Sequence, residues 1–363
     1  MMTKEKKNWI NSLAAQLQVS AMQMPLLKAM PKLELHAHLN GCVRTSTLLD
    51  LAVGENSKEK ISNTDLESLI RKEDRSLTEC FRLFPVIHAL TTDHAVVTRI
   101  TREAIEDFLL DNVVYLELRT TPKCNDLYGM SKRSYVEAVF AGFEAAGVMY
   151  KTDCDVQDGH RMHVRLLLSI DRRENAEAAM NTVQLAWDMR DRGVAGVDLS
   201  GDPAIGNWET FLPALTLAKE LGVPLTLHCG EVSNPKEVRE MLALQPRRLG
   251  HVCCLEEAEW RALLDSGIPV EICLTSNVRT ESVSSMRDHH FAALYNAKHP
   301  VVLCTDDPGL FSTSLTLEFA IAATCFGLTN LELLIMGKSA INYTFADDKT
   351  KLILHGIFDD ALQ

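Results

Sequence analysis

Short apolar runs alternate along the chain with longer segments whose apolar residues recur at helical spacing. Eight of the runs are rich in Leu and β-branched residues, a composition typical of parallel strands buried on both faces. These strands are predicted at residues 32–40, 113–121, 163–171, 194–202, 223–231, 247–253, 269–277 and 301–307. Between them, residues 209–222 and 256–267 have a helical period and end at Gly222 and Gly267. Glycine readily ends a helix because it adopts the left-handed conformation without steric cost.

Eight strands that alternate with helices predict an α/β fold, the (β/α)8 TIM barrel, whose active face is formed by the loops after the strands. The competing fold, a doubly wound open sheet, requires a glycine-rich phosphate loop after the first strand, and the sequence has none there. We therefore expect a single barrel domain over residues 1–363. Residues 1–30 are predicted to form an N-terminal helical extension, and residues 41–112 a helical insertion near the active-site mouth.

Charge and composition restrict the classes of partner. The 363 residues carry a net charge of −12, whereas nucleic acid or an anionic membrane would require a broad basic surface. No apolar run reaches the roughly 20 residues that a helix needs to cross a bilayer, and the N-terminal residues lack the apolar core of a signal peptide. Ten cysteines at irregular spacings are typical of reduced thiols. We expect a cytoplasmic protein that binds neither nucleic acid nor a membrane.

Histidine and aspartate residues stand at the ends of several predicted strands. His36 and His38 are two residues apart in the first strand, so both imidazoles point to the same face. His228 lies at the end of the fifth strand and Asp306 at the end of the eighth, where a buried carboxylate needs a cation or hydrogen bonds. Each residue alone is compatible with a structural role in the core. Together at one barrel mouth, they predict a metal site.

Three histidines and one aspartate form a ligand set that suits Zn²⁺, with a water completing the coordination. Bound zinc would lower the pKa of that water toward ~7 and make hydroxide available at neutral pH. Barrel hydrolases with two metals usually bridge them through a modified lysine late in the third or fourth strand. Residues 163–171 and 194–202 contain no lysine. We therefore expect one zinc ion per chain.

Five motifs in the order HAHLNG, LSGDP, HCGE, LGH and TDDPGLF resemble the adenosine deaminase family over residues 30–345. The resemblance is greatest to the adenosine deaminase-like branch, whose members deaminate N6-methyl-AMP. It implies a barrel of the metal-dependent hydrolase type with extra helices after the first strand, and zinc-dependent hydrolytic deamination at purine C6. The other class of zinc deaminases carries an HxE…PCxxC signature, which this sequence lacks.

The resemblance also implies roles for single residues. Glu231 resembles the acid that protonates purine N1 and makes C6 electrophilic. His251 resembles the residue that orients the attacking hydroxide, Asp307 the carboxyl group that contacts N7, and Gly201 the glycine whose backbone N–H meets N3. The chemistry requires the same parts, because hydroxide attack on an amidine-like carbon needs an activated nucleophile, a ring-nitrogen acid and a base for the leaving amine. Taken alone, Glu231 is equally compatible with a surface residue that opens the next helix.

Position 40 bears on the choice between nucleoside and nucleotide substrates. Adenosine-specific members carry an aspartate there, which resembles a partner for the ribose 5′ hydroxyl, whereas this chain has Asn40. A carboxylate would repel a 5′-phosphate, while an amide can donate to it. The resemblance implies substrate contacts from His38, Asn40, His88, Thr120, Thr121, Pro122, Lys123, Asp171, Gly201, Glu231 and Asp307.

The expected activity is deamination of a purine nucleoside monophosphate, N6-methyl-AMP or a related N6-substituted AMP, to IMP and the amine. The expected partner is that small-molecule nucleotide. Two alternatives stay open: an adenosine deaminase that acts on the free nucleoside, and a catalytically silent purine-binding protein. Arg172 and Arg173 after the third strand either add positive charge near the phosphate or form a solvated basic pair.

Overall fold

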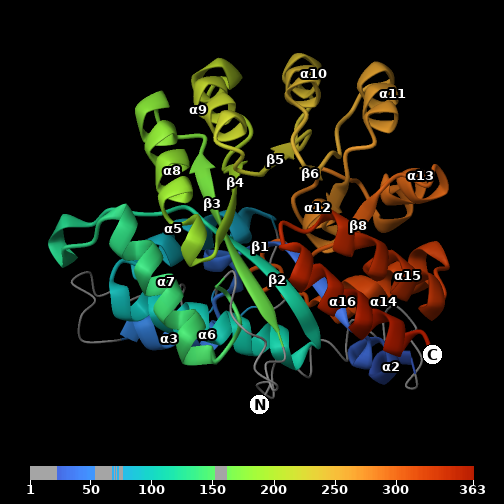
Figure 1. The fold of residues 1–363 in the computed structure, drawn as a ribbon, viewed down its shortest axis with the longest axis horizontal. Coiled ribbons are helices and arrows are strands. Elements are labelled where there is room, and N and C mark those ends of the chain that lie inside the picture. The colour runs from blue at the N-terminus through green and yellow to red at the C-terminus, as the bar shows by residue number, and fades with distance from the viewer. Residues whose placement is uncertain (1–22, 54–67, 69, 71, 73–76, 152–161) are drawn as a thin grey trace.

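The computed structural model describes residues 23–53, 68, 70, 72, 77–151 and 162–363. In this part of the chain, eight parallel strands form a single sheet that pairs in sequence order, with helices around it (Figure 1). The strands are β1 (Lys32–His38), β2 (Val113–Thr120), β3 (His163–Asp171), β4 (Val194–Ser200), β5 (Leu225–Cys229), β6 (Arg248–His251), β7 (Val270–Ile272) and β8 (Val301–Leu303). All eight lie within the runs predicted from the sequence, and the (β/α)8 barrel is confirmed.

The segment that follows β8 closes the barrel against β1. Ala37 pairs with Asp306 in a parallel bridge. The Asp306 backbone N–H donates to the His36 carbonyl at 2.8 Å, and the His38 N–H donates to the Asp306 carbonyl at 2.9 Å. These bonds hold three of the four predicted metal ligands next to one another before any side chain is considered.

Helices connect the strands and cover the outside of the barrel. They are α2 (Gln23–Ala29), α3 (Thr45–Val53), α5 (Leu77–Leu90), α6 (His94–Leu110), α7 (Lys132–Ala146), α8 (Ala176–Asp188), α9 (Trp208–Glu220), α10 (Pro235–Leu244), α11 (Glu257–Ser266), α12 (Leu274–Arg279), α13 (Phe291–Asn296), α14 (Leu315–Phe326), α15 (Asn330–Ala340) and α16 (Asp348–Ala361). Helices α8 to α11 occupy the upper half of Figure 1, and α14 to α16 its lower right. No helix within the described residues is long and apolar enough to cross a membrane.

The predicted extension (1–30) and insertion (41–112) fall partly outside the described residues, which begin at residue 23 and have gaps between 54 and 76. The described parts are helical: α2 precedes β1, and α3, α5 and α6 lie between β1 and β2. Helix α5 carries His88 to within 3.2 Å of Asn40, which follows β1. The insertion thus contributes a side chain to the end of the barrel where the predicted ligands lie.

The predicted seventh strand, residues 269–277, is wrong over its second half. Strand β7 ends at Ile272, and α12 begins at Leu274. The carboxylate of Glu318 in α14 accepts hydrogen bonds from the Thr275 backbone N–H at 3.0 Å and from the Thr275 hydroxyl at 2.5 Å. A side-chain acceptor therefore replaces the neighbouring strand as hydrogen-bond partner, and the chain turns into a helix.

Charged side chains fill much of the barrel interior, where branched apolar residues are usual in this fold. Glu117 and Arg119 of β2, Arg248 of β6 and Glu271 of β7 all have 0 % exposure. Because side chains alternate between the two faces of a strand, the residues between them face the surrounding helices. The main apolar core accordingly lies between the barrel and its helices.

Candidate metal centre and active site

The four predicted metal ligands converge at the end of the barrel where the strands finish. His36 and His38 come from β1, His228 from β5, and Asp306 from the segment after β8. Each offers one ligand atom, and the four atoms lie within 4.8 Å of one another. His38 Nε2 lies 3.1 Å from His228 Nε2 and 3.2 Å from Asp306 Oδ1.

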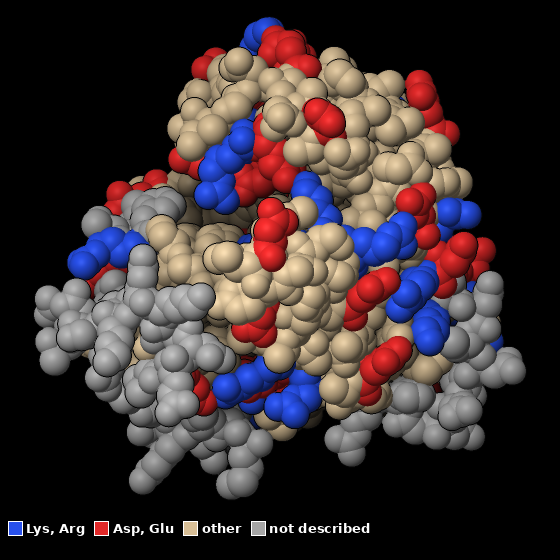
Figure 2. Space-filling model, turned by 90° about the vertical axis from the view of Figure 1, so that its left-hand side faces the viewer, with Lys and Arg blue, Asp and Glu red and all other residues tan. Residues whose placement is uncertain are grey.

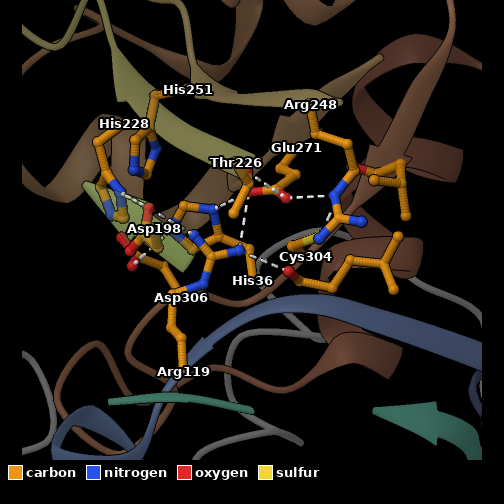
Figure 3. A network of polar contacts seen from close by, with 12 residues as sticks. His36, Arg119, Asp198, Thr226, His228, Arg248, His251, Glu271, Cys304 and Asp306 are labelled. Atoms are coloured by element: carbon orange, nitrogen blue, oxygen red, sulfur yellow. Dashed lines mark hydrogen bonds and ion pairs between the residues drawn. The ribbon is translucent and has the colours of Figure 1, made fainter. Parts of the chain in front are cut away.

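The environment of these side chains fits a bound cation. His36 Nε2 is buried and has no hydrogen-bond partner among the described residues, and it lies 3.3 Å from Asp306 Oδ1. The opposite ring nitrogens are engaged: His36 Nδ1 with Glu271 at 2.6 Å and His228 Nδ1 with Asp198 at 3.0 Å (Figure 3). A carboxylate on the far nitrogen is the usual arrangement around a metal-ligating histidine, because it fixes the ring and its tautomer. The donor set can therefore hold a metal ion.

Glu271 connects the metal group, the four side chains His36, His38, His228 and Asp306, with the barrel interior. Besides His36, its carboxylate accepts hydrogen bonds from Arg119 Nη2 at 2.9 Å, Arg248 Nε at 2.6 Å and the Thr226 hydroxyl at 2.8 Å (Figure 3). The two arginines hold the pKa of Glu271 well below its usual range although burial opposes this. A buried anion thus orients the imidazole of His36.

Close approaches of the backbone shape the mouth of the barrel. Gly41 lies against Asp307, so that a Cβ at position 41 would stand 1.7 Å from Asp307 Oδ1. His251 and Asp306 carry a Cβ, unlike glycine, and yet both have a φ of 65°, in the left-handed region. Non-glycine residues in this region cost roughly 1–3 kcal/mol each, and such strain is concentrated at functional sites.

Glu231, His251 and Asp307 stand next to the metal group. His251 Nε2 lies 3.9 Å from Glu231 Oε1. Burial raises the pKa of Glu231 to about 8, and the negative charge of Asp306 adds to the rise. The Glu231 side chain is 23 % exposed and lines a recess of the protein, together with His228 and Arg172.

Two adjacent aspartates are held in opposite protonation states. Burial opposes ionisation of Asp306, but the adjacent imidazoles of His36 and His38 outweigh it and keep the pKa of Asp306 well below its usual range. Burial and the charge of Asp306 together raise the pKa of Asp307 to about 8. The structure therefore provides one anionic ligand and, beside it, one carboxylic acid that can donate a hydrogen bond.

The remaining predicted substrate contacts surround a second part of the mouth. The Asn40 side chain lies 3.2 Å from His88 Nδ1, and Lys123 Nζ donates to the Thr91 hydroxyl at 3.1 Å. Burial lowers the pKa of His88 to about 4, and the charges of Lys123 and Arg173 lower it further. A neutral imidazole and an amide thus adjoin a cationic environment.

The side chains from Thr120 to Lys123 do not all face the same side of the barrel. The Thr120 hydroxyl is engaged with the Tyr135 hydroxyl of α7 at 2.7 Å, on the outer side of β2. Pro122 is buried, whereas Thr121 and Lys123 are half-buried. Of this stretch, the side chain of Lys123 is the one whose charge reaches His88.

Asp171 and Gly201 lie side by side at the ends of β3 and β4. Gly201 has a φ of 106°, and a Cβ there would stand 3.1 Å from Asp171 Oδ1. Asp171 is bound by Arg173 through Nε at 2.9 Å and Nη2 at 2.5 Å. Seen from the side in Figure 2, the surface is hollowed, and basic and acidic side chains both gather at the edge of the hollow.

Arg172 and Arg173 are not the solvated pair that the sequence left open. Arg172 is 4 % exposed and forms an ion pair with Glu237. It lines a small recess that also adjoins Glu231 and His228. The Arg173 side chain is 61 % exposed and belongs to the Asp171 pair.

Sequence reasoning missed the residues that support the ligands from inside the barrel, chiefly Asp198, Glu271 and Asn277. Arg119 also belongs to this interior group, and its Nη1 lies 3.4 Å from Asp198. The available signal was the placement of charged residues at alternate positions within otherwise apolar strands, as in Glu117 and Arg119. Asn277 lies in the second half of the predicted seventh strand, which is a helix in the structure. The sequence offered no signal for its role.

The chain is similar to several known proteins. The family model described as "Adenosine deaminase" matches residues 31–360. The "N6-mAMP deaminase" of Arabidopsis thaliana is 55% identical over 350 residues, which cover 93% of this chain and 99% of the relative. The "N6-Methyl-AMP deaminase" of Mus musculus is 40% identical over 333 residues and 89% of each chain. A crystal structure of "arabidopsis ADAL complexed with IMP" matches with a TM-score of 0.86 at 55% identity, over 93% of this chain and 98% of that one.

Replacing His228 by alanine should abolish metal binding while the barrel stays folded. The variant loses a ligand outright, so affinity should fall by more than the roughly 10- to 100-fold typical of losing an outer partner. Metal content after dialysis against zinc, with circular dichroism as the test of folding, measures this. His355→Ala, on α16, is the matched control and should keep full occupancy. Full occupancy in a folded His228→Ala protein would contradict the ligand assignment.

Proposed function

Because the chain belongs to the adenosine deaminase family, we propose that it is a zinc-dependent deaminase that converts N6-methyl-AMP, and related N6-substituted AMP, to IMP and the free amine. The observation that carries the proposal is the convergence of a metal-ligand group, a raised-pKa glutamic acid and an amide at position 40 at one barrel mouth. The names of the relatives at 55% and 40% identity support the same substrate. Arabidopsis structures described with IMP and with GMP support a nucleotide ligand.

His36, His38, His228 and Asp306 would hold one zinc ion per chain. When bound, zinc supplies an activated water at neutral pH as the nucleophile for purine C6. The protein contributes the orientation of the ligands, through Glu271 behind His36 and Asp198 behind His228.

Glu231 is the acid in this proposal. Purine C6 becomes electrophilic when N1 is protonated, so the acid must hold its proton until the substrate arrives. Burial and the neighbouring Asp306 charge keep Glu231 neutral up to about pH 8. Asp307, also neutral, can donate to N7, and the His251 Nε2 edge faces Glu231 from the other side.

Asn40, His88 and Lys123 provide the contacts to the 5′-phosphate. The neutral His88 and the amide of Asn40 can donate without adding negative charge, and Lys123 adds a cation. Asp171 and the Gly201 backbone complete the substrate contacts, with His38, Thr120, Thr121 and Pro122 as the remaining members of the set. We also place the protein in the cytoplasm, which fits the free cysteines of the described part of the chain.

Two other functions remain candidates for the test. A free-nucleoside deaminase would need no phosphate contacts. The paired Asn40 and His88, which we assign to the phosphate, argue against this function. A silent purine-binding protein would have no need of buried, strained and mutually oriented ligands, since strain and burial of polar groups cost stability.

Glu231→Gln should reduce turnover by roughly 100-fold or more, because glutamine keeps the shape of the acid but cannot deliver a proton to N1. Zinc content should be unchanged. The raised pKa also sets a pH dependence: the acid is protonated below about pH 8 and deprotonated above it, so wild-type kcat/KM, which follows the free enzyme, should fall as pH rises through about 8. Steady-state rates from pH 6 to 9.5 measure both effects, and near-native turnover in the variant would rule out this role.

Asn40→Asp should lower kcat/KM for N6-methyl-AMP far more than for N6-methyladenosine. The new carboxylate would face the phosphate in a partly desolvated cleft, where like charges are poorly screened. The informative quantity is the ratio of the two efficiencies, because it cancels general damage to the site. Asn296→Ala, an exposed position at the end of α13, serves as the control and should leave the ratio unchanged. An unchanged ratio in Asn40→Asp would contradict the phosphate contact.

A further inference from the structure

His251 is held from two sides, and one of its ring nitrogens is left facing the reaction site. The amide nitrogen of Asn277 lies 2.9 Å from His251 Nδ1. The His251 carbonyl accepts a hydrogen bond from His290 Nε2 at 2.7 Å. The other ring nitrogen, His251 Nε2, is buried, has no hydrogen-bond partner among the described residues, and lies 3.9 Å from Glu231 Oε1.

Asn277 stands on a rigid support. It is in α12, whose first turn is fixed by Glu318 through the Thr275 backbone N–H and hydroxyl. Ser276, which lies between Thr275 and Asn277, donates a hydrogen bond from its hydroxyl to Asp306 Oδ2 at 2.6 Å. One short helix therefore places a donor on a metal ligand and, at the next position, an amide on His251.

The buried amide of Asn277 is paired on one side only. Its side chain is 2 % exposed, and its Oδ1 atom is buried without a hydrogen-bond partner among the described residues. A buried polar atom without a partner costs about 1–3 kcal/mol, so the bond from the amide nitrogen to His251 is kept at a cost in stability. A polar residue kept at such a cost is expected where it serves a function.

We propose that Asn277 is a positioning residue that fixes the ring orientation and tautomer of His251. With the Asn277 –NH₂ group donating to Nδ1, neutral His251 carries its proton on Nε2 and presents an N–H donor to the reaction site. The proposal rests on the proposed function in one respect: His251 is the group through which Asn277 acts on turnover.

A double-mutant cycle tests the proposal. The Asn277→Ala variant should lower kcat by roughly 10- to 100-fold, the scale for a misplaced catalytic group, with KM and zinc content nearly unchanged. In a His251→Ala background, the same substitution should cost less than about 2-fold, because the residue through which it acts is gone. Equal losses in the two backgrounds would overturn the proposal. The cycle is run on whichever of N6-methyl-AMP, AMP and adenosine the wild type turns over, so a wrong substrate does not count against Asn277.

A readout without turnover separates this proposal from the proposed function. Long-range ¹H–¹⁵N spectra of the zinc-loaded protein should show His251 protonated on Nε2, with the His251→Ala variant providing the assignment. Asn277→Asp keeps the shape of the side chain but can only accept, and should move the proton to Nδ1. An Nδ1-protonated His251 in the wild type, or a tautomer that Asn277→Asp leaves unchanged, would overturn the proposal even if no purine is deaminated.

Discussion

The buried carboxylate of Glu271 is the interaction on which the site depends. It accepts hydrogen bonds from two arginines and a threonine of the barrel interior and from the imidazole of His36. Removing charges from water is expensive, and a buried ion group is stable only when every member is well paired. Breaking one buried pair typically costs about 3–5 kcal/mol. Loss of the Glu271 carboxylate would therefore both destabilise the barrel and leave the imidazole of His36 without its orienting partner.

Carboxyl groups a few ångströms apart differ in charge, anionic or neutral, because their surroundings differ. Asp306 and Glu271 stay ionised next to histidines and arginines, whereas burial and the Asp306 charge keep Glu231 and Asp307 protonated. Environments that push the pKa values of neighbouring carboxyl groups apart in this way mark an acid–base site. In the proposed function, the anions would help to hold a cation, and the neutral acids would donate protons and hydrogen bonds to a ring.

The fold and the metal group were predictable from the sequence because both follow from simple periods. Eight apolar runs gave the strands, and the two-residue spacing of His36 and His38 placed both rings on one face. The interior network was not predictable, since Glu117 and Arg248 pair across the interior although β2 and β6 are not neighbours in the sheet, and only barrel closure brings them together. The helix that carries Asn277 was missed for a similar reason: its first turn is bound by Glu318, 43 residues after Thr275 in the chain.

The most direct test of the account compares wild-type kcat/KM for N6-methyl-AMP and N6-methyladenosine, two substrates with the same base that differ only in the 5′-phosphate. Hydrogen bonds to a charged group contribute about 1.5–3 kcal/mol each, so contacts from Asn40, His88 and Lys123 should favour the monophosphate by roughly 100-fold or more. Release of methylamine, measured with zinc-loaded protein at pH 7, gives both efficiencies. Equal efficiencies, or a preference for the nucleoside, would contradict the account.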